Sequence, residues 1–388
     1  MNKTALTFGG WYQRTTLHLS EIYSLLALGH SKLPLGKNKL AEFHQKLNLK
    51  KVTREADYLE YVKAITKDGI EIRYYEDGLY VLEIETEDID KGKEKLSDYF
   101  EQVFNPAINY IFSLGAPTPK ILANIETSHP TVITINQTTN NFKIDKGKFG
   151  EVYSQITAEG VTVFKTPKHI FVSSSKKEKN TIQQIVEMQI FFREFKDQLE
   201  KYLDIHRLIW EKIADIKERQ QIKGGQVVLL RTQLEAYRKT IQLINNRINQ
   251  MGAYINTRAA IAKNLKIEKY LVELFQFKFE ILNNTLSYIK EIWQMTQDYL
   301  ESAIDIIKEI EGKSTRNSIR SLQLITTVGI ISGILGYLAQ DKLPKISSSG
   351  VVYFLLLISL TAVINGAIAV IYRNSKYRIK LTERAKRL

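Results

Sequence analysis

The stretch YLEYVKAITKDGIEIRYYEDGLYVLEIET, residues 58–86, decides the fold of the N-terminal part of the chain. Two Asp-Gly pairs, at residues 68–69 and 77–78, separate three runs in which apolar and polar residues alternate. Asp-Gly favours a tight hairpin turn, and a period of two is typical of a strand with one buried face. The stretch therefore predicts an antiparallel meander of three strands.

Further strands and short helices are predicted on both sides of this meander. We expect a strand at 3–13, helices at 18–29, 37–49 and 89–113, and more strands near 131–137, 149–157, 160–166 and 169–175. Together they predict an α/β sensing domain over residues 1–172, in an α+β arrangement.

From about residue 177 the pattern becomes purely helical, and the chain has no proline between Pro167 and Pro344. The sequence KGG at 223–225 predicts the turn of a helical hairpin, because glycine ends helices. We expect a bend near 251–253 and a third helix that starts near Lys263 and passes Gly312. Residues 177–315 are therefore predicted to form a long helical hairpin and stalk, a coiled coil.

Two segments without a charged residue follow, at 321–340 and 346–372. Because a membrane span needs about 20 mostly apolar residues, they predict a two-helix transmembrane domain over 316–388 with a basic tail. Basic residues before the first segment and after the second predict that both termini are cytoplasmic and that the protein lies in the inner or cell membrane. The alternative is a buried hairpin in a water-soluble core.

Composition excludes several kinds of site. The chain has 388 residues, a net charge of +13 and no cysteine, which rules out disulfides and thiolate metal sites. The six histidines lie at no metal-ligand spacing, and no nucleophile, base and acid stand out as a set. We therefore expect neither an enzyme nor a metal centre, and no direct nucleic-acid binding.

The stretch STRNSIRSLQLITTVGIISGILGYL, residues 314–338, resembles the CorA family of pentameric divalent-cation channels. Gly336 stands where that family has the glycine of its Gly-Met-Asn signature, and Tyr337 and Leu338 replace the Met and Asn. The resemblance implies a homopentamer with the lipid bilayer and its own copies as partners. Leu338 would make an apolar constriction instead of a polar filter.

Because it lacks this signature, the chain resembles a branch of CorA-like proteins encoded beside type III CRISPR systems. This resemblance implies an ion channel gated by its cytoplasmic domain, acting in antiviral defence and responding to a nucleotide messenger such as a SAM-AMP conjugate. Two alternatives stay open: a magnesium or cobalt transporter with a divergent filter, for which Mg²⁺ would be the cation, and a membrane-anchored coiled-coil scaffold.

Two sets of helical positions are candidate ion-pathway residues. One face of the first apolar segment, with its outer mouth, is predicted to line the pore: Ser318, Leu322, Ile325, Thr326, Gly329, Ser332, Gly336, Tyr337 and Leu338. Helix packing explains the small residues equally well. An acidic stalk face could attract cations, or could simply be solvated: Asp298, Glu301, Asp305 and Glu309.

Four residues are weak candidates for ligand binding. Trp11 follows two glycines, which allow a ligand to approach the backbone. The stretch DKGKFGEVY, followed by VTVFK, imitates a kinase phosphate loop and suggests Lys146, Lys148 and Lys165 as phosphate contacts. Kinase chemistry itself is not expected, because no catalytic-loop motif follows.

Overall fold

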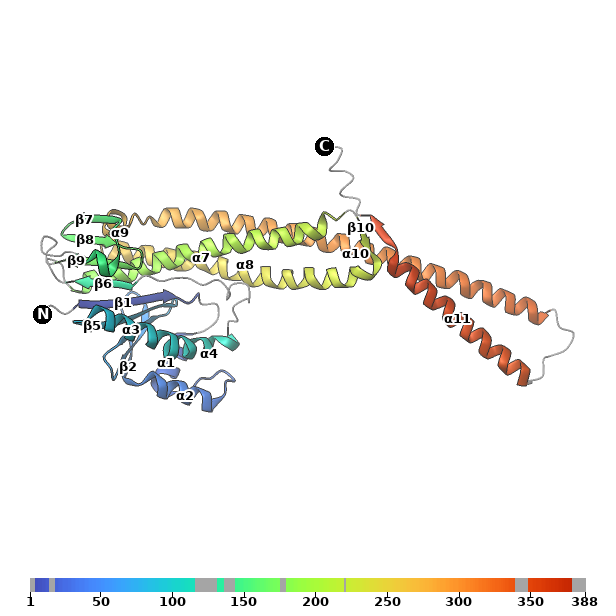
Figure 1. Cartoon of the computed structure of the whole chain (residues 1–388), viewed down its shortest axis with the longest axis horizontal. Helices are drawn as coiled ribbons and strands as arrows, with labels where there is room; N and C mark the ends of the chain where they lie inside the picture. Colours follow the sequence, from blue (N-terminus) through green and yellow to red (C-terminus); the bar gives the residue numbers. More distant parts are fainter. Residues whose placement is uncertain are drawn as a thin grey trace, which may run out of the picture. The chain divides into compact units, whose positions relative to one another are not determined.

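The computed structural model describes residues 4–13, 18–115, 131–135, 144–174, 179–219, 221–338 and 348–378. The chain forms two compact units. Unit 1 comprises residues 1–205 and 243–292, and unit 2 comprises residues 206–242 and 293–388. Figure 1 labels their helices and strands.

Unit 1 is built on a nine-stranded sheet with the order β2-β3-β4-β5-β1-β6-β9-β8-β7. Its strands are β1 (Thr4–Trp11), β2 (Leu49–Ala56), β3 (Glu60–Thr66), β4 (Glu71–Tyr75), β5 (Leu79–Thr86), β6 (Thr131–Ile135), β7 (Ser154–Ala158), β8 (Val161–Lys165) and β9 (His169–Ser174). Only β6 and β9 pair in parallel. Strands β3, β4 and β5 confirm the predicted meander, whereas β2 was not predicted.

Short helices cover one face of this sheet (Figure 1). They are α1 (Leu19–Leu28), α2 (Lys37–Leu47), α3 (Ile89–Tyr99), the π-helical turn η1 (Phe100–Phe104) and α4 (Asn105–Gly115), while α6 (Lys146–Phe149) is a single turn before β7. The alternating apolar residues of the strands, such as Ile72 and Leu82, form one buried core with Leu25 and Phe104 from these helices. This packing removes one face of the sheet from water.

The described helices that follow are the long α7 (Lys179–Lys217), α8 (Val227–Asn264), α10 (Phe279–Leu338) and α11 (Ser348–Asn374), with the short α9 (Glu268–Phe275) between α8 and α10. The sequence also allows a break at 251–253, and this break is absent, because α8 continues through these residues as one helix. The predicted single helix from Lys263 is interrupted at Lys266 and Gln276, which adopt left-handed backbone angles of 56° and 60° in φ. Neither residue is a glycine, so no sequence signal marked these breaks.

In unit 2 the turn between α7 and α8 is held against the end of α11. Strand β10 (Gln221–Lys223) pairs with β11 (Lys376–Arg378), and the 3₁₀ turn η3 (Gly224–Gln226) follows β10. The Gly224 amide donates to the Ser375 carbonyl at 2.9 Å. A Cβ at Gly224 would lie 2.4 Å from the Tyr372 carbonyl oxygen, so only glycine fits this predicted turn.

The prediction of two C-terminal transmembrane helices is wrong. Across the described part of the chain, no helix combines the length and the apolar character that crossing a bilayer requires. The prediction counted charges, and absence of charge is a weaker condition than sustained apolarity. In α10, for example, residues 321–333 interleave serine, glutamine, threonine and glycine with aliphatic residues.

The same finding contradicts the predicted membrane protein class and the predicted inner or cell membrane location with its orientation. The lipid bilayer as a partner stays a prediction. The sequence between the two apolar segments, DKLPKISSSG at 341–350, was expected to connect the spans outside the cell, and most of it lies outside the described residues.

Candidate ligand-binding site

A cavity of about 180 Å³ lies in unit 1 between the sheet and the N-terminal turns of α7. Strands β1, β4, β5, β6 and β9 supply one wall, and residues 179–187 of α7 supply the other. It lies on the face of the sheet opposite to the core shared with α1 to α4, because the residues of β4 and β5 that line it alternate with those that enter that core. The site therefore combines side chains from six separate parts of the sequence.

The charged floor of the cavity is centred on Arg73, which is only 3% exposed. Its guanidinium lies 2.8 Å from Glu83 and 2.8 Å from Glu187, and it also contacts Glu71. Burial alone would lower the pKa of Arg73, but Glu187 and Glu83 outweigh this effect and raise it. Arg73 is therefore permanently charged, and three carboxylates surround its guanidinium.

Glu187, on α7, is held from three sides. The Tyr75 hydroxyl donates to it at 2.7 Å, and the Gln183 side-chain amide donates at 3.1 Å. Arg73 supplies the third contact through its Nε atom. These contacts fix the inner end of the cavity.

At the outer end, Lys179 from the first turn of α7 forms an ion pair with Glu85 of β5. The two side chains are 70% and 46% exposed, so water screens this pair far more than it screens Arg73. Counting both pairs, the cavity wall carries the cations Arg73 and Lys179 against the carboxylates Glu83, Glu85 and Glu187. The wall therefore has an excess of one negative charge.

The remaining wall is suited to a small organic body. Ile182 and Val186 provide apolar surface, and Thr7 and Thr134 provide hydroxyl groups. A cavity of about 150 Å³ in another protein holds one benzene molecule. By that measure this cavity takes a group of about one ring, and not a whole dinucleotide.

A smaller cavity of about 90 Å³ adjoins the first and shares Gln183 and Glu187 with it. Tyr58, Tyr61 and Arg258 are among its other lining residues. The guanidinium of Arg258 donates two hydrogen bonds to the Asp77 carboxylate, at 2.6 and 2.9 Å. Both side chains are at most 4% exposed. This buried pair is a structural support behind the smaller cavity.

Trp11, predicted as a ligand contact, is instead packed into the protein. The centre of its ring lies 5.5 Å from the ring centre of Phe195 and 5.7 Å from that of Phe191. Its Nε1 donates a hydrogen bond to the Asp77 backbone carbonyl at 2.7 Å. A Cβ at the preceding Gly10 would lie 2.4 Å from the Tyr80 hydroxyl. In this structure the glycine therefore makes room for a tyrosine ring.

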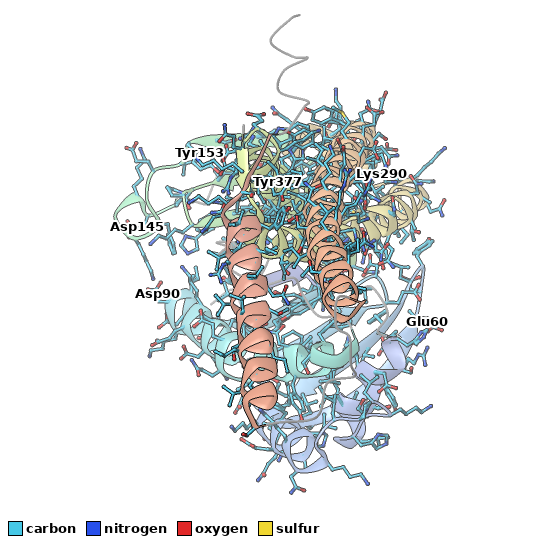
Figure 2. All side chains as sticks on the ribbon, turned by 90° about the vertical axis from the view of Figure 1, so that its right-hand side faces the viewer. Glu60, Asp90, Asp145, Tyr153, Lys290 and Tyr377 are labelled. Carbon is cyan, nitrogen blue, oxygen red and sulfur yellow. The ribbon has the colours of Figure 1, made fainter. Side chains whose placement is uncertain are left out.

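The three predicted lysines do not line either cavity. Lys148 pairs with Asp90 at 2.7 Å, on the flank where Figure 2 shows Asp90 and Asp145. Lys146 belongs to the same turn, which Asp145 caps. Lys165 is half-buried over the Phe275 ring, and burial lowers its pKa. Their role in binding phosphate stays a prediction.

The predicted acidic stalk face lies on α10 in unit 2, and each member has a nearby partner. Asp298 accepts from Gln294 at 3.0 Å, Glu301 lies 3.9 Å from Arg238, Asp305 lies 3.9 Å from Lys308, and Glu309 lies 2.5 Å from Lys313. The basic neighbours of Glu301, Asp305 and Glu309 offset their negative charge within one chain, whereas Gln294 is neutral. Attraction of cations by this face stays a prediction.

The predicted pore-lining residues also lie on α10. Leu322, Thr326, Gly329 and Ser332 are exposed, while Ser318 and Ile325 are half-buried. The side chains of Gly336, Tyr337 and Leu338 lie outside the described residues. Whether this set lines a pore stays a prediction. Within the described ranges, no three His, Asp or Glu side chains come close enough to share a metal ion.

Comparison with known proteins gives a weak likeness to solved structures. No family model matches the chain, and no curated protein matches it. Among solved structures, the CorA magnesium transporter from Methanocaldococcus jannaschii aligns with 65% of this chain and 93% of its own, at 15% identity and a TM-score of 0.25. The predicted resemblance to CorA is supported to this extent only, and a score this low carries no conclusion about fold or function.

Sequence reasoning missed the cavity residues, although one signal was present. On β4 and β5 the charged residues Glu71, Arg73, Glu83 and Glu85 recur every second position, opposite the apolar face of the same strands. A charged face with this period is usually solvated. Its burial under α7 depends on contacts that the local pattern does not encode.

Proposed function

We propose that the chain is a small-ligand-binding regulatory protein, and not an enzyme, whose ligand occupies the cavity between the sheet and α7. The observation that carries this proposal is the cavity itself, which joins a charged floor to an apolar wall in a space of about 180 Å³. Concave sites with mostly apolar walls and a few fixed polar groups are the usual form of small-molecule sites. The sensing role predicted for the N-terminal domain has this cavity as its candidate site.

The nucleotide messenger expected from the CorA-like resemblance is one candidate ligand. Three carboxylates in the wall oppose a phosphate group, since like charges repel strongly where water is excluded. A nucleotide would therefore enter this cavity with its base and keep its phosphates outside. The conducting, membrane-embedded role expected from the same resemblance required spanning helices and is not part of this proposal.

A compound screen against the full chain tests the proposal, with unfolding temperature as the first readout and ligand-observed NMR as the second. The library holds nucleosides, nucleotides and single-ring fragments. Ala5→Leu adds three carbons inside the cavity and should abolish binding of every hit. Ala41→Leu makes the same change at an exposed position of α2 and should leave binding intact. Hits that bind both variants equally, or a screen without hits, would overturn the proposal.

We also propose that copies of this chain associate through α10 and α11, as the predicted homopentamer requires. Large apolar side chains are exposed along both helices, often at neighbouring positions such as Ile330 and Ile331, or Leu355 and Leu356. Neighbouring residues point about 100° apart on a helix, so the apolar surface covers more than one side. A single flat contact leaves part of it in water, whereas several copies can cover it.

Light scattering coupled to size-exclusion chromatography measures the assembly. The full chain should run as an oligomer, and Leu324→Gln combined with Leu360→Gln should reduce its mass towards that of one chain. Leu28→Gln, on α1, replaces an equally exposed leucine away from these helices and should leave the mass unchanged. A monomeric full chain would refute self-association.

A further inference from the structure

The chemistry of the cavity wall narrows the class of ligand, on the assumption that the cavity binds one. The wall carries one more carboxylate than it has cations. Arg73 is not available to an anionic ligand, because Glu71, Glu83 and Glu187 already surround it. An anion therefore finds no open positive partner on this floor, while a cation finds excess negative charge.

At the rim of the cavity, a lysine of the protein itself occupies the position that a ligand cation would take. The Lys179 ammonium sits on Glu85, and both side chains are largely open to water. An exposed pair of this kind contributes little to stability, because water screens it and two long side chains must be held in place. A ligand ammonium can therefore take the place of Lys179 at little cost, and Lys179 can turn outwards into water.

The body of the ligand follows from the rest of the wall. Ile182 and Val186 of α7 line the cavity, so one wall beside the carboxylates is apolar. Burial of a ring there removes apolar surface from water at about 25 cal/mol per Å². The volume of about 180 Å³ limits the body to about one ring.

We infer that the cavity binds a compact organic ammonium, which is a protonated amine on an apolar body of about one six-membered ring. The ammonium lies on Glu85 and Glu83 and displaces Lys179. The ring lies against Ile182 and Val186. This inference rests on the proposed ligand-binding function and adds the class of ligand.

Three probes of nearly equal shape and different charge test the class: benzylamine, benzyl alcohol and sodium benzoate. Binding to the full chain is measured by isothermal titration calorimetry and ligand-observed NMR at low salt. Benzylamine should bind at least fivefold more tightly than benzyl alcohol, and benzoate should not bind. Tighter binding of benzoate, or equal binding of all three, would overturn the inference.

Two substitutions at the rim are expected to change the affinity for benzylamine in opposite directions. Lys179→Gln removes the competing cation and should strengthen benzylamine binding up to about fivefold, which corresponds to the upper worth of an exposed ion pair. Glu85→Gln should weaken it. The matched controls Lys46→Gln and Glu42→Gln change an exposed pair on α2 and should alter nothing. Weaker benzylamine binding in Lys179→Gln would contradict displacement.

The same experiments separate the two proposals. If none of the three probes binds but other compounds bind and are blocked by Ala5→Leu, the ammonium class is wrong and the ligand-binding function stands. If Ala5→Leu has no effect on any compound, both are wrong.

Discussion

Replacing Arg258 with methionine should make unit 1 substantially easier to unfold. Arg258 is 4% exposed and makes two hydrogen bonds to the Asp77 carboxylate, at 2.6 and 2.9 Å. The substitution keeps most of the side-chain volume but leaves the Asp77 charge buried without its partner. Breaking a buried ion pair from one side costs about 3–5 kcal/mol. At about 2–4 °C per kcal/mol for a unit of this size, the melting temperature should fall by about 6–20 °C.

A double-mutant cycle tests whether the pair is the cause. Urea unfolding of Arg258→Met, Asp77→Asn and the double variant is followed by circular dichroism. The double variant should be at least as stable as the less stable of the two single variants, because removing both charges leaves no unpaired charge buried. Arg54→Met, in the exposed pair with Glu60, should cost less than about 1 kcal/mol. A small loss for Arg258→Met, or single effects that simply add, would refute this reasoning.

Two further predictions concern turns and pH. Gly69→Ala and Gly78→Ala both place alanine at a positive φ, but only at Gly78 would the new Cβ meet an atom, 2.0 Å from the Tyr12 carbonyl oxygen. Urea unfolding should therefore show a loss of about 1 kcal/mol for Gly69→Ala and at least about 2 kcal/mol for Gly78→Ala, and equal losses would contradict the clash. Burial, reinforced by Lys93, lowers the pKa of His169 to about 4. The unfolded chain then binds a proton that the folded chain lacks between about pH 6.5 and 4, so stability should fall as pH falls through that window. The urea midpoint of His169→Asn should change less between pH 7 and 4.5, and an unchanged pH dependence would refute the assignment.

Much of unit 1 could be predicted because its signals are local. The two Asp-Gly turns and the alternation of apolar residues are contained within 29 consecutive residues, 58–86. Strand β2 gave no such signal, because a sheet edge exposed to water carries charged residues such as Lys51 and Arg54 on both faces. Its assignment depends on pairing with β3, which the isolated stretch does not reveal.

In the helical part of the chain, glycine did not predict where the helices break. Gly252 was expected to bend α8, yet the helix continues there, beside Leu286 and Lys290 of α10. The real breaks occur at Lys266 and Gln276, where non-glycine residues adopt left-handed angles. Tertiary packing explains both outcomes, since it can hold a glycine in a helix and can offset the cost of a strained angle.

The candidate site follows from the same alternation that predicted the meander. A strand that sends Ile72 and Tyr74 into the core must send Glu71, Arg73 and Tyr75 to the other face. On a sheet with one solvated face these charges would only keep the protein soluble. Here α7 covers them, and a buried charge must be paired, so the helix has to bring Glu187 to Arg73. The cavity wall still carries three carboxylates against two cations, and this excess of negative charge is the reason to expect a cation as its ligand.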